Sequence, residues 1–306
     1  MAGRPGTHTD VELVAVPHEV VATWPVGTFL ENIAITPDDD FVVSVHNRHE
    51  LHRVSPGGEH SKWVSMPAPP AGMIAAADGV WVVGGEPGQG PHHVYFVTWT
   101  GEVTERDAVT GSLFLNGFTP GPAGIGFTVD SITGTVIAVE LASGASQVVV
   151  TDERLRKLSA EPMLPGANGI KAGDGALYLT NTDRALVLAA PLDATGRPTG
   201  AVETVAEHLR GDDLAVSSDG DLFITNHIHN TLIRLNPTTG DRVAVAGPQQ
   251  GMAGCTACVF GTAANDPMSL YVTTTGGIVM PLDGVVQDAK LVRLQVGVTG
   301  RPLTVL

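Results

Sequence analysis

The chain has 306 residues, of which 43% are hydrophobic and 16% are charged, and its formal net charge is −15. This apolar content excludes a disordered chain and is sufficient for a large core. The acidic balance excludes the basic surface that binds phosphate backbones, so nucleic acid is not expected as a partner.

The chain is expected to consist of a short N-terminal segment and one domain. Residues 1–10 are predicted to be a flexible N-terminus, and residues 11–306 are predicted to form a single domain. The start lacks the apolar region of a secretory signal, and no run approaches the roughly 18 apolar residues of a membrane span. We therefore expect a cytoplasmic protein without a membrane partner.

Six strand-like runs recur along the chain at intervals of about 40–50 residues, the range of propeller repeats. They are rich in aromatic and β-branched residues, and most follow Gly or Asp turn residues. Six units of four strands predict an all-β fold, a six-bladed β-propeller with four antiparallel strands per blade. Residues 11–24 are predicted to supply an outer strand to the last blade and close the ring. The runs are residues 40–45, 79–85, 125–131, 176–181, 221–226 and 269–274.

An oxygen-bearing side chain stands at the predicted start of the innermost strand in four of the six units, as Glu31, Asn116, Asn168 and Asp212. In the second unit this position falls at Gly72 or a neighbour, and in the sixth it falls within GCTACVFG. Equivalent positions of a propeller converge on its axis. Two carboxylates and two amide oxygens suit Ca²⁺ best, then Mg²⁺ or Mn²⁺, with Zn²⁺ less expected. The sequence therefore predicts one divalent cation on the axis.

A turn is the alternative interpretation of these positions. Asn168-Gly169 is a common hairpin signal, and an Asp-Asp pair also suits a turn. Glu is a poor turn residue, yet Glu31 occupies the same position of the repeat, which favours the axial site. Asp213 would take the place of Asp212 if the register is off by one residue.

The second strand of each blade should return to the end where the innermost strand begins, so the loop after it should border the site. The repeats place His46 and His227 in this loop, and we predict that they exchange protons, with Asp212 as a third catalytic residue. Surface or turn histidines are the alternative. Substrate contacts are predicted for Asn116, Asp130, Ser131, Thr182 and His229.

Two loops carry further predictions. Asp130 has an alternative role as the cap of the turn at residues 131–134. Residues 84–96 form a Gly- and Pro-rich loop that contains His92 and His93 and could act as a lid over the site.

The two cysteines, Cys255 and Cys258, are predicted to be small buried residues of a strand. A redox pair or half of a zinc site is the alternative for their C-x-x-C spacing, but no second such motif exists. Residues 153–162 are the most helix-like stretch of the chain, and this stretch is short.

The layout resembles the senescence-marker-protein/gluconolactonase (regucalcin-like) family of six-bladed propellers. Glu31 corresponds to the Glu near the start of that family, and Asn168 in ANGI to its P-N-G-[LI] motif. Asp212 in GDDL corresponds to its P-D-[GD]-[LM] motif, and Asn116 in LNGF to a further Asn. The resemblance implies one divalent ion on Glu31, Asn168 and Asp212, with lactone hydrolysis as the activity.

The sequence departs from the family pattern in two places. The usual G-E-G-P-x-W start is LENIAI here, and residues 116–127 form an uncharged run in place of N-D-G-K-x-D-P-x-G-R. A sugar lactone needs polar groups to hold its hydroxyls, whereas an apolar mouth would suit a hydrophobic substrate. Some related propellers perform ring-forming chemistry on hydrophobic metabolites.

Three functions are therefore considered. The first is a divalent-metal-dependent hydrolase that acts on a lactone or related cyclic ester in the axial pocket. The alternative is a cyclase of secondary metabolism that uses the same pocket, and the second alternative is a non-catalytic propeller that binds a ligand. Each implies a small-molecule partner, hydrophobic in the second case. A closed ring has no sheet edge that demands a partner, so a monomer is expected.

Overall fold

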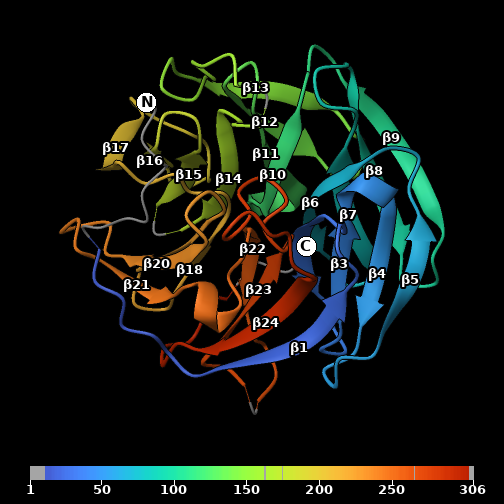
Figure 1. The fold of residues 1–306 in the computed structure, drawn as a ribbon. Coiled ribbons are helices and arrows are strands. Elements are labelled where there is room, and N and C mark those ends of the chain that lie inside the picture. Colours follow the sequence, from blue (N-terminus) through green and yellow to red (C-terminus); the bar gives the residue numbers. More distant parts are fainter. Residues whose placement is uncertain (1–10, 162, 174, 265, 303–306) are drawn as a thin grey trace.

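Six four-stranded antiparallel sheets surround a central axis as the blades of a propeller (Figure 1). The computed structural model describes residues 11–302 except 162, 174 and 265, so the flexible segment predicted for residues 1–10 lies outside the described residues. The innermost strands are β2, β6, β10, β14, β18 and β22, which contact one another around the axis. The predicted all-β, six-bladed architecture is confirmed.

The strands of each blade follow one another outward from the axis in chain order, except that β1 is the outermost strand of blade six. Blade one contains β2 (Leu30–Ile35), β3 (Phe41–Val45), β4 (Glu50–Val54) and β5 (His60–Ser65). Blade two contains β6 (Pro70–Ala75), β7 (Gly79–Gly84), β8 (His92–Thr98) and β9 (Val103–Val109). Blade three contains β10 (Leu115–Pro120), β11 (Ile125–Asp130), β12 (Thr135–Glu140) and β13 (Ser146–Thr151). Blade four contains β14 (Ala167–Ala172), β15 (Ala176–Asn181), β16 (Leu186–Pro191) and β17 (Glu203–Glu207). Blade five contains β18 (Leu214–Val216), β19 (Leu222–Asn226), β20 (Thr231–Leu235) and β21 (Arg242–Ala246). Blade six contains β22 (Cys255–Phe260), β23 (Ser269–Thr274), β24 (Ala289–Gln295) and β1 (His18–Trp24), and short 3-10 turns lie at η1 (His46–Arg48), η2 (Pro122–Gly124) and η3 (Pro248–Gln250).

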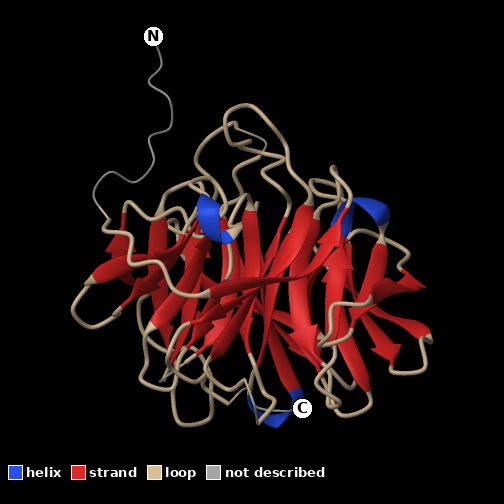
Figure 2. Ribbon diagram, turned by 60° about the horizontal axis from the view of Figure 1, so that its bottom comes forward, coloured by secondary structure: helices blue, strands red, loops and turns tan. Residues whose placement is uncertain are grey.

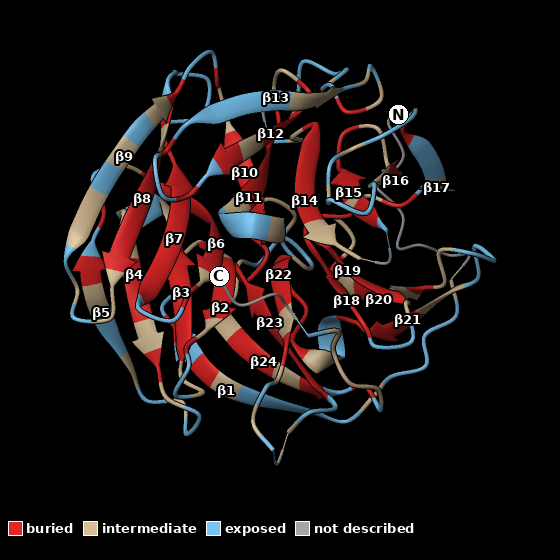
Figure 3. Ribbon diagram, turned by 180° about the vertical axis from the view of Figure 1, so that it is seen from behind, coloured by how far each residue is buried: buried red, intermediate tan, exposed pale blue. Residues whose placement is uncertain are grey.

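The six strand-like runs of the sequence are the second strands of the blades, namely β3, β7, β11, β15, β19 and β23. Most of their residues are buried, because the core of this fold lies between the faces of adjacent blades (Figure 3). One such cluster packs Ile74 and Phe96 of blade two against Phe118 and Ile137 of blade three. A strand buried on both faces favours β-branched and aromatic residues, which explains why these runs stand out in the sequence.

The ring is closed by the N-terminal strand, as predicted. β1 pairs antiparallel with β24 as the outermost strand of blade six. Trp24 at the end of β1 is 1% exposed, and its Nε1 donates a hydrogen bond to Nδ1 of His52 at 3.1 Å. Since His52 belongs to β4 of blade one, this contact joins the last blade to the first.

The innermost strands share an irregular step near their starts. In blades one, three and four the pairing with the second strand shifts between Leu30 and Ile33, between Leu115 and Phe118, and between Ala167 and Ile170. An extra residue of this kind redirects the side chains at the bulge. The step contains the residues singled out in the sequence, namely Glu31, Asn116 and Asn168.

Buried hydroxyl groups of the second strands hold this step in place. In blade five the N–H of Asp213 donates to Oγ1 of Thr225 at 2.9 Å, and this hydroxyl donates to the carbonyl of Thr256 at 2.6 Å. In blade four the N–H of Gly169 donates to Oγ1 of Thr180 at 2.8 Å. Each hydroxyl thus satisfies a backbone group at the bulge, and Thr225 also ties its blade to the next one.

The turn interpretation of Asn168-Gly169 is wrong, because both residues lie inside β14. Gly169 is required for another reason. A Cβ atom on it would lie 2.6 Å from Cα of Asp213 and 2.7 Å from the carbonyl oxygen of Asp212. The absent side chain therefore allows β14 to approach the start of β18 closely enough for Asn168 and Asp212 to share one site.

The two ends of the ring differ. We call the end where the innermost strands begin the mouth end, and the end where they finish the far end. Residues 299–302 cross the far end, where the N–H of Arg301 donates to the carbonyl of Val216 at 2.9 Å. Figure 2 shows the described C-terminus at this end of the ring, with tall loops at the other.

Three smaller predictions concern local structure. Cys255 and Cys258 are free, buried thiols of β22, as predicted, and burial raises the pKa of Cys255 to about 12. Residues 153–161 form turns, bends and irregular chain instead of a helix. No helix in the described part of the chain is long and apolar enough to cross a membrane.

Candidate functional site

The mouth end carries a ring of six equivalent side chains, five from the innermost strands and one, Asp212, from just before β18. Counting back two residues from the first regular pair gives the same position in every blade. Four members are the predicted residues Glu31, Asn116, Asn168 and Asp212. In blade two the position is occupied by Ala71, next to the expected Gly72, and in blade six by Thr256. The register taken from the repeats is thus correct, and Asp213 is not the axial residue of blade five.

Asp212 and His227 form a buried pair in this ring. Oδ2 of Asp212 lies 3.0 Å from Nδ1 of His227, and the side chains are 12% and 6% exposed. The other ring nitrogen of His227, Nε2, is buried without a hydrogen-bond partner. A buried, unpaired polar atom is costly in a folded protein. His227 therefore presents a nitrogen that a ligand of the site can satisfy.

The ring is crowded with negative charge. Burial raises the pKa of Glu31 well above its usual value, and the charges of Asp212 and Asp213 raise it further. Burial also raises the pKa of Asp212, although the contact with His227 opposes this change. These shifts mean that the ionised carboxylates lack sufficient compensation within the protein.

Thr182 orients Asn168. Nδ2 of Asn168 donates to Oγ1 of Thr182 at 2.9 Å, and this hydroxyl donates to the carbonyl of Gly211 at 2.6 Å. Thr182 thereby holds the amide nitrogen of Asn168. This leaves the carbonyl oxygen of Asn168 available to bind a cation or to accept a hydrogen bond. The sequence predicts a substrate contact for Thr182, and the structure shows that its hydroxyl group supports Asn168.

His46 and His229 lie in the loops after the second strands of blades one and five. Nδ1 of His46 lies 3.0 Å from the carbonyl oxygen of Pro70, and burial lowers the pKa of His46, which favours the neutral ring. The ring of Phe29 lies between the two predicted histidines, with centroid distances of 5.9 Å to His46 and 6.0 Å to His227. His229 is half-buried, and its N–H donates to Oδ1 of Asn226.

Asp130 and Ser131 have structural roles. Oδ1 of Asp130 accepts the N–H groups of Ile132 and Thr133 at 2.9 and 2.8 Å, and Oδ2 accepts the N–H of Leu113 at 2.6 Å. The hydroxyl of Ser131 donates to the carbonyl of Ala167 in blade four at 2.6 Å. Both side chains are fully buried. Capping of the turn, the alternative stated for Asp130, is what the structure shows, and neither residue is retained as a substrate contact.

The loop expected to act as a lid is fastened to blade three. Nδ1 of His92 accepts the N–H of Leu115 at 3.2 Å, and its Nε2 bonds to the carbonyl of Glu86 at 3.0 Å. The N–H of Gly88 donates to the carbonyl of Leu113 at 2.8 Å. His92 is fully buried, so it serves to hold the loop.

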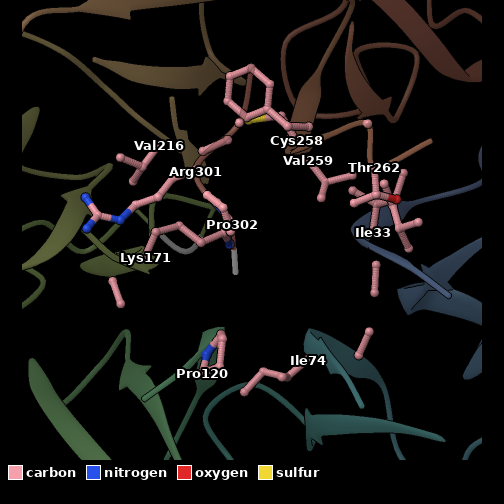
Figure 4. A pocket seen from close by; sticks show the side chains of 18 of the residues that line it. Ile33, Ile74, Pro120, Lys171, Val216, Cys258, Val259, Thr262, Arg301 and Pro302 are labelled. Atoms are coloured by element: carbon pink, nitrogen blue, oxygen red, sulfur yellow. The ribbon is translucent and has the colours of Figure 1, made fainter. Parts of the chain in front are cut away.

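A cavity of about 410 Å³ lies on the axis at the far end, away from the ring of Glu31 and Asp212 (Figure 4). All six innermost strands contribute to its wall, together with residues 299–302. The uncharged run 116–127 was expected to make the mouth apolar, and this expectation is wrong. Asn116 lies in the mouth-end ring, whereas Phe118 and Pro120 line the far cavity.

Lys171 is a residue that the sequence analysis missed. It lies in β14, and its Nζ is 3.0 and 2.9 Å from the two carboxylate oxygens of Asp213. The available signal was a single charged residue in an otherwise uncharged innermost strand, ANGIKA. Its partner lies in the next blade, so the repeat alone could not reveal the pair.

The residues at the mouth fit a hard divalent cation by the chemistry of their donors. Glu31 and Asp212 supply carboxylate oxygens, and Asn168 supplies an amide oxygen that its own nitrogen contacts leave available. Within the described residues, no group of three or more His, Cys, Asp or Glu side chains has the spacing of a metal site. The amide of Asn168 is therefore essential to a three-residue set.

The comparisons with known proteins agree with this architecture. Residues 41–276 match the family described as the SMP-30/Gluconolactonase/LRE-like region. A luciferin-regenerating enzyme has a TM-score of 0.75 and 14% identity over 95% of this chain and 99% of its own. A calcium-binding regucalcin from Agrobacterium tumefaciens has a TM-score of 0.73 and 18% identity over 96% and 98% of the two chains. At these identities the likeness concerns the fold, and no curated protein sequence matches.

Proposed function

The chain belongs to the SMP-30/gluconolactonase/LRE-like family, and from this membership we propose that it is a divalent-metal-dependent hydrolase. Its substrate would be a lactone or a related cyclic ester. Glu31, Asn168 and Asp212 would hold the cation, with Ca²⁺ the first candidate and Mg²⁺, Mn²⁺ or Zn²⁺ the others. The single observation that carries the proposal is the buried Asp212–His227 pair, whose Nε2 has no partner, beside the carboxylate of Glu31.

Each residue of the site would have a separate role in hydrolysis. A bound divalent cation supplies Lewis acidity toward a carbonyl oxygen. Asp212 orients the ring of His227 through Nδ1, so that Nε2 can accept or return a proton in the site. Asn116, as the fourth polar member of the ring, would orient the substrate. His46, whose lowered pKa favours a neutral ring and whose Nδ1 donates to the carbonyl of Pro70, would accept a hydrogen bond at Nε2 on the rim.

The two alternatives differ in their support. The cyclase alternative depended on an apolar mouth, and the residues that suggested it line the far cavity instead. A non-catalytic binding propeller would use the same cluster of Glu31, Asp212 and His227 without turnover. The hydrolase proposal therefore has to be tested by metal binding and by turnover separately.

The first experiment measures cation binding to protein purified without chelator, by elemental analysis and by calorimetric titration with Ca²⁺. We expect one ion per chain in the wild type, and loss of binding in Glu31→Gln and Asp212→Asn. Glu153→Gln is the matched control, because that side chain is 80% exposed on the surface. A wild-type protein that binds none of the four candidate cations would refute the proposal.

The second experiment measures proton release from a panel of lactones and aldonolactones. We expect His227→Gln to lower turnover by about 10²-fold or more, the usual contribution of a general acid or base, while cation binding persists. Cation binding with no hydrolysis of any lactone in the panel would favour the non-catalytic alternative.

A further inference from the structure

A buried ion pair adjoins the proposed cation site. Nζ of Lys171 lies within 3.0 Å of both carboxylate oxygens of Asp213, and the side chains are 13% and 6% exposed. Asp213 follows the proposed ligand Asp212 directly in the chain, and Lys171 lies three residues after Asn168 in β14. The pair is therefore part of the immediate electrostatic surroundings of the site.

The charges around the axis can be counted from these contacts. The charged or titratable groups that act on the carboxylates of Glu31, Asp212 and Asp213 are one another, His227 and Lys171, and the side chain of Asn168 also donates a hydrogen bond to Asp212. When the three carboxylates are ionised, their negative charges and the positive charge of Lys171 leave two negative charges. The unpaired Nε2 of His227 is an independent sign that the cluster is completed by a ligand. A divalent cation is the ligand whose charge equals the remainder.

We propose that Lys171 sets the valence selectivity of the axial site, because it cancels the charge of Asp213 and leaves Glu31 and Asp212 to match a divalent cation. This inference depends on the proposed function, since it assumes a cation site. Lys171 would act as a positioning residue in the electrostatic sense, because it contacts Asp213 and is not one of the proposed ligands.

The test compares the affinities for Ca²⁺ and Tb³⁺ by calorimetry in four proteins. Lys171→Met removes one positive charge, so the site becomes more negative by one unit and the ratio of Tb³⁺ to Ca²⁺ affinity should rise by roughly tenfold or more. Asp213→Asn removes one negative charge, so the ratio should fall by a similar factor. The ratio changes because, at an effective dielectric constant of about 20, each unit of negative charge attracts a trivalent ion half as strongly again as a divalent ion. The double variant Lys171→Met/Asp213→Asn should return to the wild-type ratio.

The ratio separates charge from structure. A purely structural role for the ion pair would weaken both ions together and leave the ratio unchanged in every variant, which would overturn the inference. If Lys171→Met does not fold, Asp213→Asn and the double variant still give the comparison. Failure of the wild type to bind either ion would refute the proposed function, whereas binding with invariant ratios would refute only the role of Lys171.

A second inference comes independently from the far cavity. Its wall is mainly apolar, with Ile33, Met73, Ile74, Phe118 and Val259 among the lining residues. The volume of about 410 Å³ falls in the range of small-molecule sites, and voids of this size are otherwise rare in packed proteins.

The charged side chains of the wall do not offer a free charge to a ligand. Lys171 is neutralised by Asp213, and the guanidinium of Arg301 points away from the open centre (Figure 4). The wall segment 299–302 is fixed by two backbone hydrogen bonds, between Arg301 and Val216 and between Ser218 and Thr299. We infer that the far cavity binds a neutral, apolar small molecule, separately from the mouth-end site.

The probe for this test is N-phenylnaphthylamine, a neutral apolar dye whose fluorescence rises on burial. We expect saturable binding of one dye per chain, weakened at least tenfold by Ile74→Trp or, as a milder filling variant, Ala34→Leu. Leu158→Trp is the matched control, because Leu158 is 74% exposed. Binding that is unaffected by both filling variants would overturn the inference. Binding that appears only after removal of residues 303–306 would assign the cavity to the end of the chain and would also overturn it.

Discussion

At the scale of single residues, the axial carboxylates are expected to make the free energy of unfolding depend on pH. The pKa values of Glu31, Asp212 and Asp213 are raised in the folded protein, with burial as the largest cause. The folded state therefore holds these protons more tightly than the unfolded state does. Their contribution to stability is fully present below the unfolded pKa values of about 4 and is lost as the pH rises through the folded values.

We expect chelator-treated protein to lose unfolding free energy as the pH rises above about 4, and Glu31→Gln to reduce this slope. Urea denaturation at a series of pH values gives the measurement, with the exposed Glu153→Gln as control. Identical slopes in the wild type and Glu31→Gln would contradict the prediction. Saturating Ca²⁺ should reduce the slope in the wild type, because a cation favours the ionised carboxylates.

The residues of the site were predictable to the extent that they repeat. Glu31, Asn116, Asn168 and Asp212 share one register position, and alignment of the units is sufficient to find it. Lys171 and the internal roles of Asp130 and Ser131 were not predictable, because each depends on a contact that no repeat encodes. The sequence shows which residues are equivalent, and only the structure shows which atoms are already bonded.

At the scale of strands, the close approach of β14 to the start of β18 at Gly169 should make this position intolerant of a side chain. A Cβ atom at this position would lie 2.6 Å from Cα of Asp213, and neither backbone can move without separating β14 from β18. We expect Gly169→Ala to cost about 1–3 kcal/mol or more in unfolding free energy and to weaken cation binding. Chemical denaturation and Ca²⁺ titration provide the two measurements.

Gly57→Ala is the matched control for Gly169→Ala, since a Cβ atom at Gly57 would meet only Oγ of Ser55 at 3.7 Å. Equal stability of the two variants would contradict the close-approach argument.

From the local sequence alone, the Asn168-Gly169 pair predicts a turn. The neighbouring strand that makes the glycine necessary lies more than 40 residues further along the chain, which is why the local reading was wrong.

At the scale of the whole ring, Trp24 is the contact on which closure is expected to depend. It belongs to blade six and contacts blade one, with its ring centroid 4.2 Å from that of His60 and its Nε1 bonded to His52. We expect Trp24→Ala to cost about 3–5 kcal/mol and Trp24→Phe less, because the phenyl ring keeps part of the packing.

Hydrogen exchange of β1 and β24 checks where the ring weakens. In Trp24→Ala the amides of these two strands should exchange faster than those of β14 and β15 on the opposite side of the ring. A uniform increase around the ring would contradict a localised role for Trp24.

The number of blades and the closure by residues 11–24 could be predicted from the repeat. The far cavity could not, since its wall needs residues 299–302 to cross from blade six to blade five.

The pairing of β1 with β24 also has a consequence for biosynthesis. β1 leaves the ribosome before the other described strands of the ring, and its partner β24 follows all of them in the chain. Blade six is therefore incomplete until translation of the domain is nearly finished, while the blades between can already form their own sheets. During this interval β1 has unpaired backbone groups along its length, and the nascent chain must avoid pairing them with another polypeptide.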